Sequence, residues 1–285
     1  MSDNKININW YPGHMTKAKR MMEENIKLID LVIEIVDARI PLSSRNPDID
    51  KLANNKYRLI CLNKSDLSDK THNEKWMEYF KSKGFFVTMI NSKSGAGVKN
   101  INNIILDVCK EKIERDRKRG IKNRPIRAMV CGIPNVGKST FINSLVGKAA
   151  AKTGNKPGVT KGKQWIRLNK NIELLDTPGI LWPKFESNEV GLNLALIGSI
   201  NDEILNLDDL SYELIERLKE NYGGLLAEKY SINEEDNEIK ILSDIAVNRG
   251  CIAKGGEPDI EKAAKLLFDD YRNGRIGKIT LEYVE

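Results

Sequence analysis

The chain has 285 residues, of which 40% are apolar and 30% charged, a balance typical of a globular protein with one large domain and a smaller one. No run approaches the roughly 18 uninterrupted apolar residues of a membrane helix, and the polar residues 1–9 lack a secretory signal core, so neither a membrane span nor export is expected. Four scattered cysteines without a CxxC pair argue against a disulfide framework or a zinc site and fit a reducing cytoplasm.

Charge is distributed unevenly along the chain. Residues 1–186 carry 35 Lys and Arg against 19 Asp and Glu, whereas residues 187–285 carry 11 against 21. The first part should therefore attract a polyanion, and the second, taken whole, should not. Two segments concentrate the cations: residues 110–124 hold eight Lys and Arg, and residues 148–170 hold seven and no acid. The first of these segments is either a solvated helix end or a nucleic-acid contact.

Short apolar runs alternate with helical patterns over residues 1–186. The predicted strands are Leu31–Val36, Tyr57–Leu62, Phe85–Ile90, Ile126–Cys131, Gln164–Leu168 and Ile172–Leu175. The predicted helices are Thr16–Leu28, His72–Lys83, Val98–Arg119 and Lys138–Val146. Strands that alternate with helices favour an α/β fold with a mostly parallel sheet covered on both faces.

The strand signal fades from about residue 187. Apolar residues recur at helical spacing in Glu189–Ile197, Tyr212–Glu220, Ile239–Asn248 and Asp259–Arg272. The sequence therefore predicts two domains. Residues 1–186, with an amino-terminal arm and helix over 1–28, form the α/β domain, and residues 187–285 form a small all-α domain that ends in a short tail.

The strongest motif is the run Gly132-Ile133-Pro134-Asn135-Val136-Gly137-Lys138-Ser139, which matches GxxxxGK[ST] between a strand and a helical pattern. Such a P-loop wraps phosphates with backbone N–H groups, helped by the positive end of the following helix. Lys138 should reach the β- and γ-phosphates, and the Ser139 hydroxyl should ligate Mg²⁺. The contacts expected from this loop involve Asn135, Val136, Gly137, Lys138, Ser139 and Thr140.

Two further segments complete the predicted phosphate and Mg²⁺ site. Asp176-Thr177-Pro178-Gly179 follows a strand, where the carboxylate can hold Mg²⁺ and the Gly179 N–H can sense the γ-phosphate. Between this motif and the P-loop lies Pro157-Gly158-Val159-Thr160, in which Thr160 can ligate Mg²⁺ and close over the γ-phosphate. Each segment alone is weak evidence for a phosphate site. Its position after the P-loop makes it a good candidate for this role.

A base-recognition motif, Asn63-Lys64-Ser65-Asp66, follows the second predicted strand. The Asp66 carboxylate can accept hydrogen bonds from N1–H and the 2-amino group of guanine, and adenine would leave it unpaired. Lys64 should lie along the purine, and Asn63 should brace neighbouring loops. The next predicted strand ends in Asn91-Ser92-Lys93, where backbone amides can support base recognition. A guanine site disfavours a P-loop ATPase or a small-molecule kinase.

The motifs stand in an unusual order. Ordinary small GTPases run from the phosphate loop to the base motif, whereas here NKSD and NSK precede the phosphate loop. A closed Ras-like P-loop NTPase domain tolerates this circular permutation if the old termini are joined and a new break follows DTPG. That break leads straight into the helical domain, so we expect nucleotide state to be passed to it through this connection.

The permuted order and two further runs carry a specific resemblance. These runs are Asp37-Ala38-Arg39-Ile40-Pro41 after the first strand and Trp10-Tyr11-Pro12-Gly13-His14-Met15 near the start. With them, the chain resembles the circularly permuted GTPases, and among them the YlqF type of the ribosome biogenesis GTPase A family, over essentially its whole length. The resemblance implies a factor in late assembly of the large (50S) ribosomal subunit, with hydrolysis stimulated by that subunit, and a helical domain that helps to dock on rRNA.

The resemblance also bears on hydrolysis. Ile180 stands where a water-positioning glutamine often follows the DxxG glycine, and isoleucine cannot orient water. In the family a histidine of the PGH motif is proposed for this, and it corresponds to His14, which without the family would more readily be an exposed or structural residue. The expected catalytic residues are therefore His14, Lys138 and Thr160. Asn135 is similar to an asparagine that ligates K⁺ between phosphates, or is simply a turn residue.

Two functions follow from these observations. The first is a GTP-hydrolysing switch with GTP/GDP, Mg²⁺ and K⁺ as its cofactors, which binds the large-subunit precursor through rRNA and ribosomal proteins in the GTP state. The second is an RNA-binding module that GTP regulates and whose hydrolysis is incidental. Further RNA contacts are expected from Arg249, Lys254, Arg272, Arg275 and Lys278, and no DNA partner is expected.

Overall fold

The computed structural model describes residues 11–121, 124–147 and 164–284 of the chain. It divides into two compact units. The described part of the first unit runs to Lys184 and includes the chain again from Glu282, and the second unit is Phe185–Leu281. The predicted boundary after residue 186 thus lies two residues later than this division, and the last residues of the tail group with the first unit.

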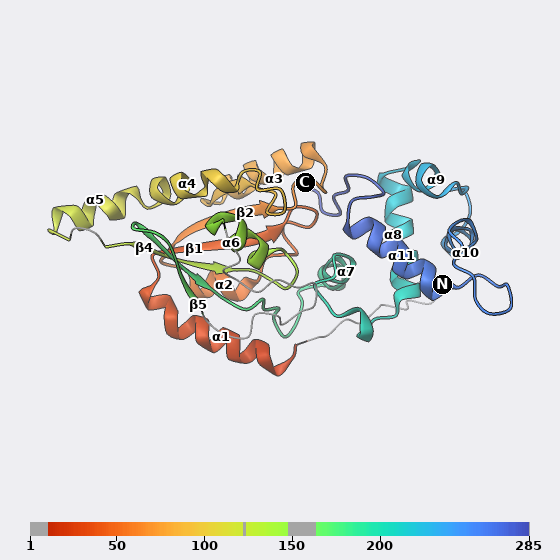
Figure 1. Ribbon diagram of the computed structural model, residues 1–285, viewed down its shortest axis with the longest axis horizontal. Helices are drawn as coiled ribbons and strands as arrows, with labels where there is room; N and C mark the ends of the chain where they lie inside the picture. Colours follow the sequence, from red (N-terminus) through yellow and green to blue (C-terminus); the bar gives the residue numbers. More distant parts are fainter. Residues whose placement is uncertain (1–10, 122–123, 148–163, 285) are drawn as a thin grey trace. The chain divides into compact units, whose positions relative to one another are not determined.

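One six-stranded sheet forms the centre of the first unit (Figure 1). Its strands are β1 (Leu31–Asp37), β2 (Tyr57–Asn63), β3 (Phe86–Met89), β4 (Ile126–Cys131), β5 (Gln164–Asn169) and β6 (Ile172–Asp176). They lie in the order β3-β2-β1-β4-β6-β5, and every pair is parallel except β5 with β6. The predicted α/β fold with a mostly parallel sheet is therefore confirmed. β1 is buried along its whole length, as expected for a central strand covered on both faces.

Helices flank this sheet. They are α1 (Gly13–Asn25), α2 (Pro47–Leu52), α3 (Lys70–Ser82), α4 (Ile101–Val108), α5 (Lys110–Lys118) and α6 (Lys138–Val146), with short 3-10 turns at Ile26–Leu28 and Val98–Asn100. In Figure 1, α1 lies on the opposite side of the strands from α4 and α5. The six-residue α2 was missed by the sequence analysis, although Asn46 caps it and Pro47 begins it, because it is too short for a periodic apolar pattern.

The prediction of one continuous helix over Val98–Arg119 is wrong. The helix is interrupted at Cys109, whose backbone (φ −95°, ψ 10°) leaves the helical region. Before this point α4 buries Ile101, Ile105 and Val108, whereas after it only Lys112 of α5 is buried. The apolar face of the helix ends at Cys109. The charged α5 therefore lacks the buried apolar side chains that α4 has.

The sheet register decides which loops meet. β1 and β2 pair from Leu31 with Tyr57 to Asp37 with Asn63, so the last residues of both strands lie side by side. β4 continues into Gly132, and Val130 pairs with Asp176 at the end of β6. Because the carboxyl ends of parallel strands share one edge, this edge collects the segments that follow β1, β2, β4 and β6.

The second unit contains the helices α7 (Asn188–Leu196), α8 (Leu207–Asn221), α9 (Leu225–Tyr230), α10 (Glu238–Asn248) and α11 (Ile260–Arg272), with a 3-10 turn at Asp202–Ile204. Residues Asn206, Asn237 and Asp259 cap three of them through their side chains. α8 starts five residues before the predicted Tyr212, at this cap, and the six-residue α9 was not predicted. No helix in the described ranges is long and apolar enough to cross a membrane.

The end of the chain is anchored on the first unit. The Glu282 carboxylate accepts hydrogen bonds from the backbone N–H groups of Leu42 (2.7 Å) and Ser43 (2.9 Å) and from the Ser43 hydroxyl. Trp76 Nε1 donates to the Glu282 carbonyl at 3.0 Å, and Tyr283 packs edge-on against His72. These contacts explain why the tail groups with the α/β unit and not with the helices that precede it.

Candidate functional site

The phosphate loop joins β4 to α6 and depends on its glycines. Gly132 (φ 147°) and Gly137 (φ 95°) both have positive φ. A Cβ at Gly132 would lie 2.4 Å from the Ile35 carbonyl oxygen, and one at Gly137 would lie 2.4 Å from Asn63 Nδ2. Asn135 also has positive φ (60°), which asparagine tolerates better than most residues. The loop is thus held close to its neighbours and leads directly into the first turn of α6, where Ser139 and Thr140 are half-buried.

Lys138 is the buried cation of this loop. Its side chain is 7% exposed, and Nζ donates a hydrogen bond to the Ile133 carbonyl at 2.8 Å. Burial lowers the pKa of Lys138 to about 8. The charge of Asp176 opposes this effect, and a phosphate in the loop would add further negative charge beside the ammonium.

Asp176 closes β6 beside this loop and fits a divalent cation. It is 1% exposed, and neither carboxylate oxygen has a hydrogen-bond partner of normal geometry among the described residues. Burial raises the pKa of Asp176 to about 6, against the opposing effect of the Lys138 charge. A desolvated carboxylate with unpartnered oxygens is costly alone and suits Mg²⁺, which prefers oxygen ligands.

The segment after Asp176 packs directly on the phosphate loop. A Cβ at Gly179 would lie 2.8 Å from Lys138 Nζ and 2.9 Å from the Pro134 nitrogen, so glycine is required there. The Thr177 hydroxyl donates to the Val130 carbonyl at 2.9 Å. The next residue, Ile180, is buried with its N–H 3.4 Å from the Gly132 carbonyl. The structure thus brings the two predicted phosphate motifs together and turns Ile180 into the protein interior.

Asn63 links three loops. Its Nδ2 donates to the Val136 carbonyl at 2.6 Å, and its Oδ1 accepts from the Ser92 N–H at 3.0 Å. Asn63 is 2% exposed, so these bonds lie away from solvent, where unmade bonds are expensive. The predicted base motif, the Asn91–Lys93 loop and the phosphate loop therefore lie together at one edge of the sheet.

The rest of the base motif is presented at the surface of this edge. Asp66 is exposed, and the loop behind it is fixed by Ser65, whose hydroxyl donates to the Ile90 carbonyl at 3.0 Å. In the neighbouring loop, Asn91 Oδ1 accepts from the N–H groups of Lys93 (2.9 Å) and Ser94 (3.0 Å). An exposed carboxylate on a fixed loop can accept hydrogen bonds from a base without prior rearrangement.

A buried ion cluster supports Lys64, and the sequence analysis did not identify it as such. Asp37 is fully buried, and its carboxylate accepts hydrogen bonds from Arg39 Nε (2.9 Å) and Nη2 (2.8 Å) and lies 2.9 Å from Lys64 Nζ. Burial would raise the pKa of Asp37, but the charges of Arg39 and Lys64 hold it well below its usual range. The Asp37-Ala38-Arg39 run was noticed only as a family resemblance. Its pairing with Lys64 depends on the β1–β2 register and on the left-handed backbone of Lys64 (φ 58°).

Replacing Asp37 by asparagine should lower the free energy of unfolding by about 3 kcal/mol at pH 7, because two cations lose their shared buried carboxylate. The pKa of Asp37 is lower in the folded state than in the unfolded chain, so this stabilisation is present above about pH 4 and is lost as the pH falls through the folded-state pKa. Urea unfolding at pH 7 measures the first effect, and a series of unfolding curves from about pH 4 downwards follows the second. Asp107→Asn, an exposed change on α4, is the control, and an Asp37→Asn protein as stable as this control would contradict the role of the cluster.

Of the predicted catalytic residues His14 and Thr160, the structure describes only His14. His14 is exposed in the first turn of α1. The next residue, Met15, is buried, and its Sδ accepts from the Leu181 N–H at 3.4 Å, so the start of α1 lies beside the segment that follows Gly179. Thr160, Trp10 and most of the basic segment 148–170 lie outside the described residues.

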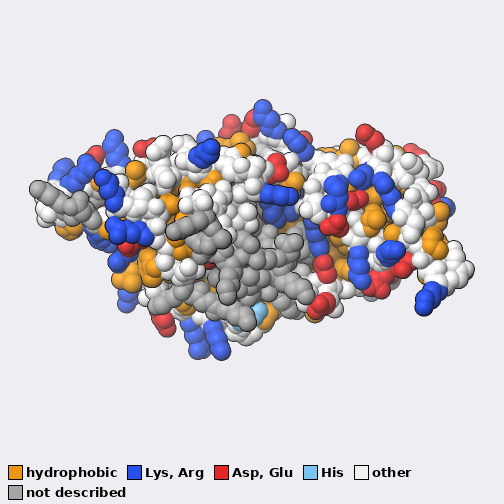
Figure 2. Space-filling view, viewed as in Figure 1, with side chains coloured by type: hydrophobic (Ala, Val, Ile, Leu, Met, Phe, Trp, Pro, Cys, Tyr) orange, Lys and Arg blue, Asp and Glu red, His pale blue; other side chains and the backbone are white. Residues whose placement is uncertain are grey.

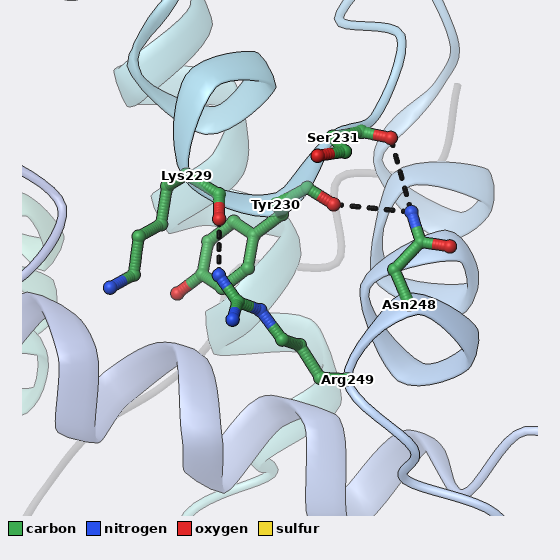
Figure 3. A pocket seen from close by; sticks show the side chains of 5 residues that line it. All are labelled: Lys229, Tyr230, Ser231, Asn248 and Arg249. Atoms are coloured by element: carbon green, nitrogen blue, oxygen red, sulfur yellow. Dashed lines mark hydrogen bonds between the residues drawn. The ribbon is translucent and has the colours of Figure 1, made fainter.

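The second unit holds a polar cavity of about 530 Å³ lined by Lys229, Tyr230, Ser231, Asn248 and Arg249 (Figure 3). The Arg249 guanidinium lies over the Tyr230 ring and donates to the Lys229 carbonyl. Asn248 Nδ2 donates to the carbonyls of Tyr230 and Ser231 at 3.1 Å. Of the cations predicted for this unit, Arg249 lines the cavity, and Lys254 and Lys278 are exposed. Arg272 forms an ion pair with Asp202, and Arg275 forms ion pairs with Asp269 and Asp270.

Comparisons with known proteins found similar sequences and a similar fold. A family profile described as "50S ribosome-binding GTPase" matches residues 127–246. The chain is 49% identical to ribosome biogenesis GTPase A of Bacillus cereus over 279 residues, which covers 98% of this chain and 94% of that protein. It is 46% identical to ribosome biogenesis GTPase A of Priestia megaterium, with 97% of each chain covered. Its fold is similar to the GDP-bound structure of YlqF from Thermotoga maritima, with a TM-score of 0.66 at 29% identity over 92% of this chain and 98% of that one.

Proposed function

This chain belongs to the ribosome biogenesis GTPase A family and is a GTPase, and from that premise we propose that it is a GTP-hydrolysing switch in late assembly of the large ribosomal subunit. The single observation that carries the switch is the packing of Gly179 against Lys138 and Pro134. A γ-phosphate bound beside Lys138 would meet the segment that leads, within a few residues, into the second unit. Loss of that phosphate would release the same segment.

In this proposal GTP lies along the carboxyl edge of the sheet. Asp66 reads guanine, Lys64 lies along the base, and Asn63 joins the base loop to the phosphate loop. The nucleotide contacts come from Asn63, Lys64, Asp66, Asn91, Ser92, Lys93, Asn135, Val136, Gly137, Lys138, Ser139, Thr140, Thr160 and Gly179. The support is the bonding of Asn63 to both neighbouring loops and the exposed Asp66.

Mg²⁺ would be held by Ser139, Thr160 and Asp176, where it would neutralise phosphate charge. The two oxygens of buried Asp176, which accept no hydrogen bond of normal geometry within residues 11–121, 124–147 and 164–284, support this assignment. Asn135, with its left-handed backbone on the phosphate loop, is the proposed K⁺ ligand. A K⁺ ion there would stabilise the charge that develops between the phosphates.

The attacking water needs a polar group other than residue 180, because Ile180 is buried. We assign this task to His14, which is exposed at the start of α1 beside the Gly179–Leu181 segment. His14→Ala should lower kcat for GTP hydrolysis roughly 10²-fold and leave the Kd for GTP unchanged, because loss of a general base acts on the chemical step. Thr16→Ala, on the same exposed turn, is the control. A fall in GTP affinity equal to the fall in kcat would contradict a water-orienting role.

The proposed partner is the precursor of the large subunit, reached through its rRNA and ribosomal proteins, which implies action in the cytoplasm. The cationic first part of the chain and the Arg249 cavity support an RNA contact. The experiment is co-sedimentation with purified large subunits in the presence of a non-hydrolysable GTP analogue or GDP. Binding with the analogue and release with GDP is the expected result. Equal binding in both states would favour an RNA-binding module in which hydrolysis is incidental.

A further inference from the structure

A second cavity, of about 400 Å³, lies at the opposite edge of the sheet from the nucleotide motifs. Its walls come from the segments that precede β1 and β2 (Asp30 and Lys56), from α5, and from Arg124, which precedes β4. The nucleotide motifs follow the other ends of these parallel strands. β1 has seven residues, so about 20 Å of strand separates the two edges. The cavity is therefore not part of the proposed GTP site.

Both acidic residues that line the cavity, Asp30 and Asp116, are engaged in ion pairs. Lys112 of α5 is 7% exposed, and its Nζ lies 2.5 Å from Asp116 and 3.5 Å from Asp30. Arg124 pairs with the same Asp30 at 3.2 Å. The Lys112 ammonium, through a hydrogen bond, lowers the pKa of Asp116 below its usual range. These bonds fix α5 against the strand ends and give the cavity a built floor.

The cations around this floor remain available. Lys56, Arg115 and Arg119 line the cavity and have no ion-pair partner within the described ranges. Arg115 and Arg119 stand four residues apart, with Arg115 in α5 and Arg119 immediately after it, so both lie on the same side as Lys112. Five cationic and two acidic side chains line the cavity, which leaves a net charge of about +3. In Figure 2, Lys and Arg side chains gather around the part of the first unit where α5 lies.

We propose that this cavity, which we call the α5 pocket, binds phosphodiester groups of RNA and forms a docking surface separate from both the GTP site and the helical unit. The inference rests on the proposed ribosomal partner, and it says where the first unit would contact the RNA. Guanidinium groups form paired hydrogen bonds with phosphate oxygens, and two of them here flank a concave site. The pocket is polar and strongly cationic, which suits a nucleic-acid backbone better than an apolar partner.

The chain offers a matched control on the same helix. Arg115→Gln/Arg119→Gln removes two charges that line the α5 pocket, and Arg117→Gln/Lys118→Gln removes two exposed charges of α5 that do not line it. None of these residues belongs to the proposed nucleotide site. Binding of each variant is measured with two probes, purified large ribosomal subunits in the presence of a GTP analogue and a short double-stranded RNA, across 50–300 mM potassium chloride.

The pocket variant should bind both probes about tenfold more weakly than the wild type and show a salt slope smaller by roughly 1.5 to 2, while the control variant changes far less. Equal weakening in the two variants would overturn the inference, because only net charge would matter. Unchanged subunit binding in the pocket variant would also overturn it and leave the proposed function intact. A different result would separate the two proposals: no protein binds subunits, and of the two variants only the pocket variant loses binding to the double-stranded RNA. In that case the proposed function fails, while the α5 pocket is still an RNA-binding site. The affinity for GDP is measured as a folding control, and equal values for the wild type and both variants confirm that the first unit is folded.

Discussion

Replacing Lys138 by alanine should lower kcat for GTP hydrolysis about 10³-fold, the range seen when one preorganised donor to a developing charge is removed. The ammonium is already buried at the phosphate loop, and its hydrogen bond to the Ile133 carbonyl holds it there. Burial lowers the pKa of Lys138 to about 8, so a bound phosphate would raise this pKa again and gain a strong interaction with the ammonium. Single-turnover hydrolysis measures the chemical step without interference from product release.

The matched control is Lys75→Ala, an exposed lysine of α3 away from the site. Its hydrolysis rate should stay within about twofold of the wild type, as expected for a surface substitution. A Lys138→Ala protein that hydrolyses GTP at more than one tenth of the wild-type rate would mean that the loop stabilises the transition state by other means.

Asp66→Asn should reverse the base preference of the site. The wild type should prefer guanosine to xanthosine triphosphate by about 10³-fold or more, because the wrong base leaves a carboxylate unpaired. Asparagine presents a donor in place of one acceptor oxygen, which matches the extra carbonyl of xanthine. The loop should survive the change, because the bonds that fix it come from Ser65 and Asn63. Competition binding with both triphosphates gives the ratio directly.

Asp107→Asn, an exposed change on α4, should leave the preference for guanine unchanged. If Asp66→Asn lowered affinity for both nucleotides alike, Asp66 would support the loop and not read the base. If neither affinity changed, the assignment of the NKSD motif to base recognition would be wrong.

The strands could be predicted closely from the sequence, because the central ones are short apolar runs buried on both faces. β4 has the predicted bounds, and β1 and β2 each extend one residue further, into Asp37 and Asn63. These polar residues end the apolar signal although they continue the ladder, and both belong to the site. The short α2 and α9 and the break at Cys109 escaped prediction, since one or two helical turns carry too little periodicity to be recognised.

The neighbourhood of the candidate site could also be predicted, because each motif follows a strand and parallel strands share their carboxyl edge. The Asp37–Arg39–Lys64 cluster could not be predicted from spacing, since it depends on register and on the positive φ of Lys64. The same holds for the α5 pocket. The charge of residues 110–124 was visible, but which cations would be paired depended on how α5 packs against Asp30.

The most direct test of the account is the rate of GTP turnover in potassium buffer with and without purified large ribosomal subunits and their precursors. A GTPase switch of subunit assembly should turn over slowly alone and at least about tenfold faster with the particle, since the partner completes the arrangement of the transition state. An unchanged rate with every particle, despite normal GTP binding, would contradict the switch and leave a nucleotide site whose partner lies elsewhere.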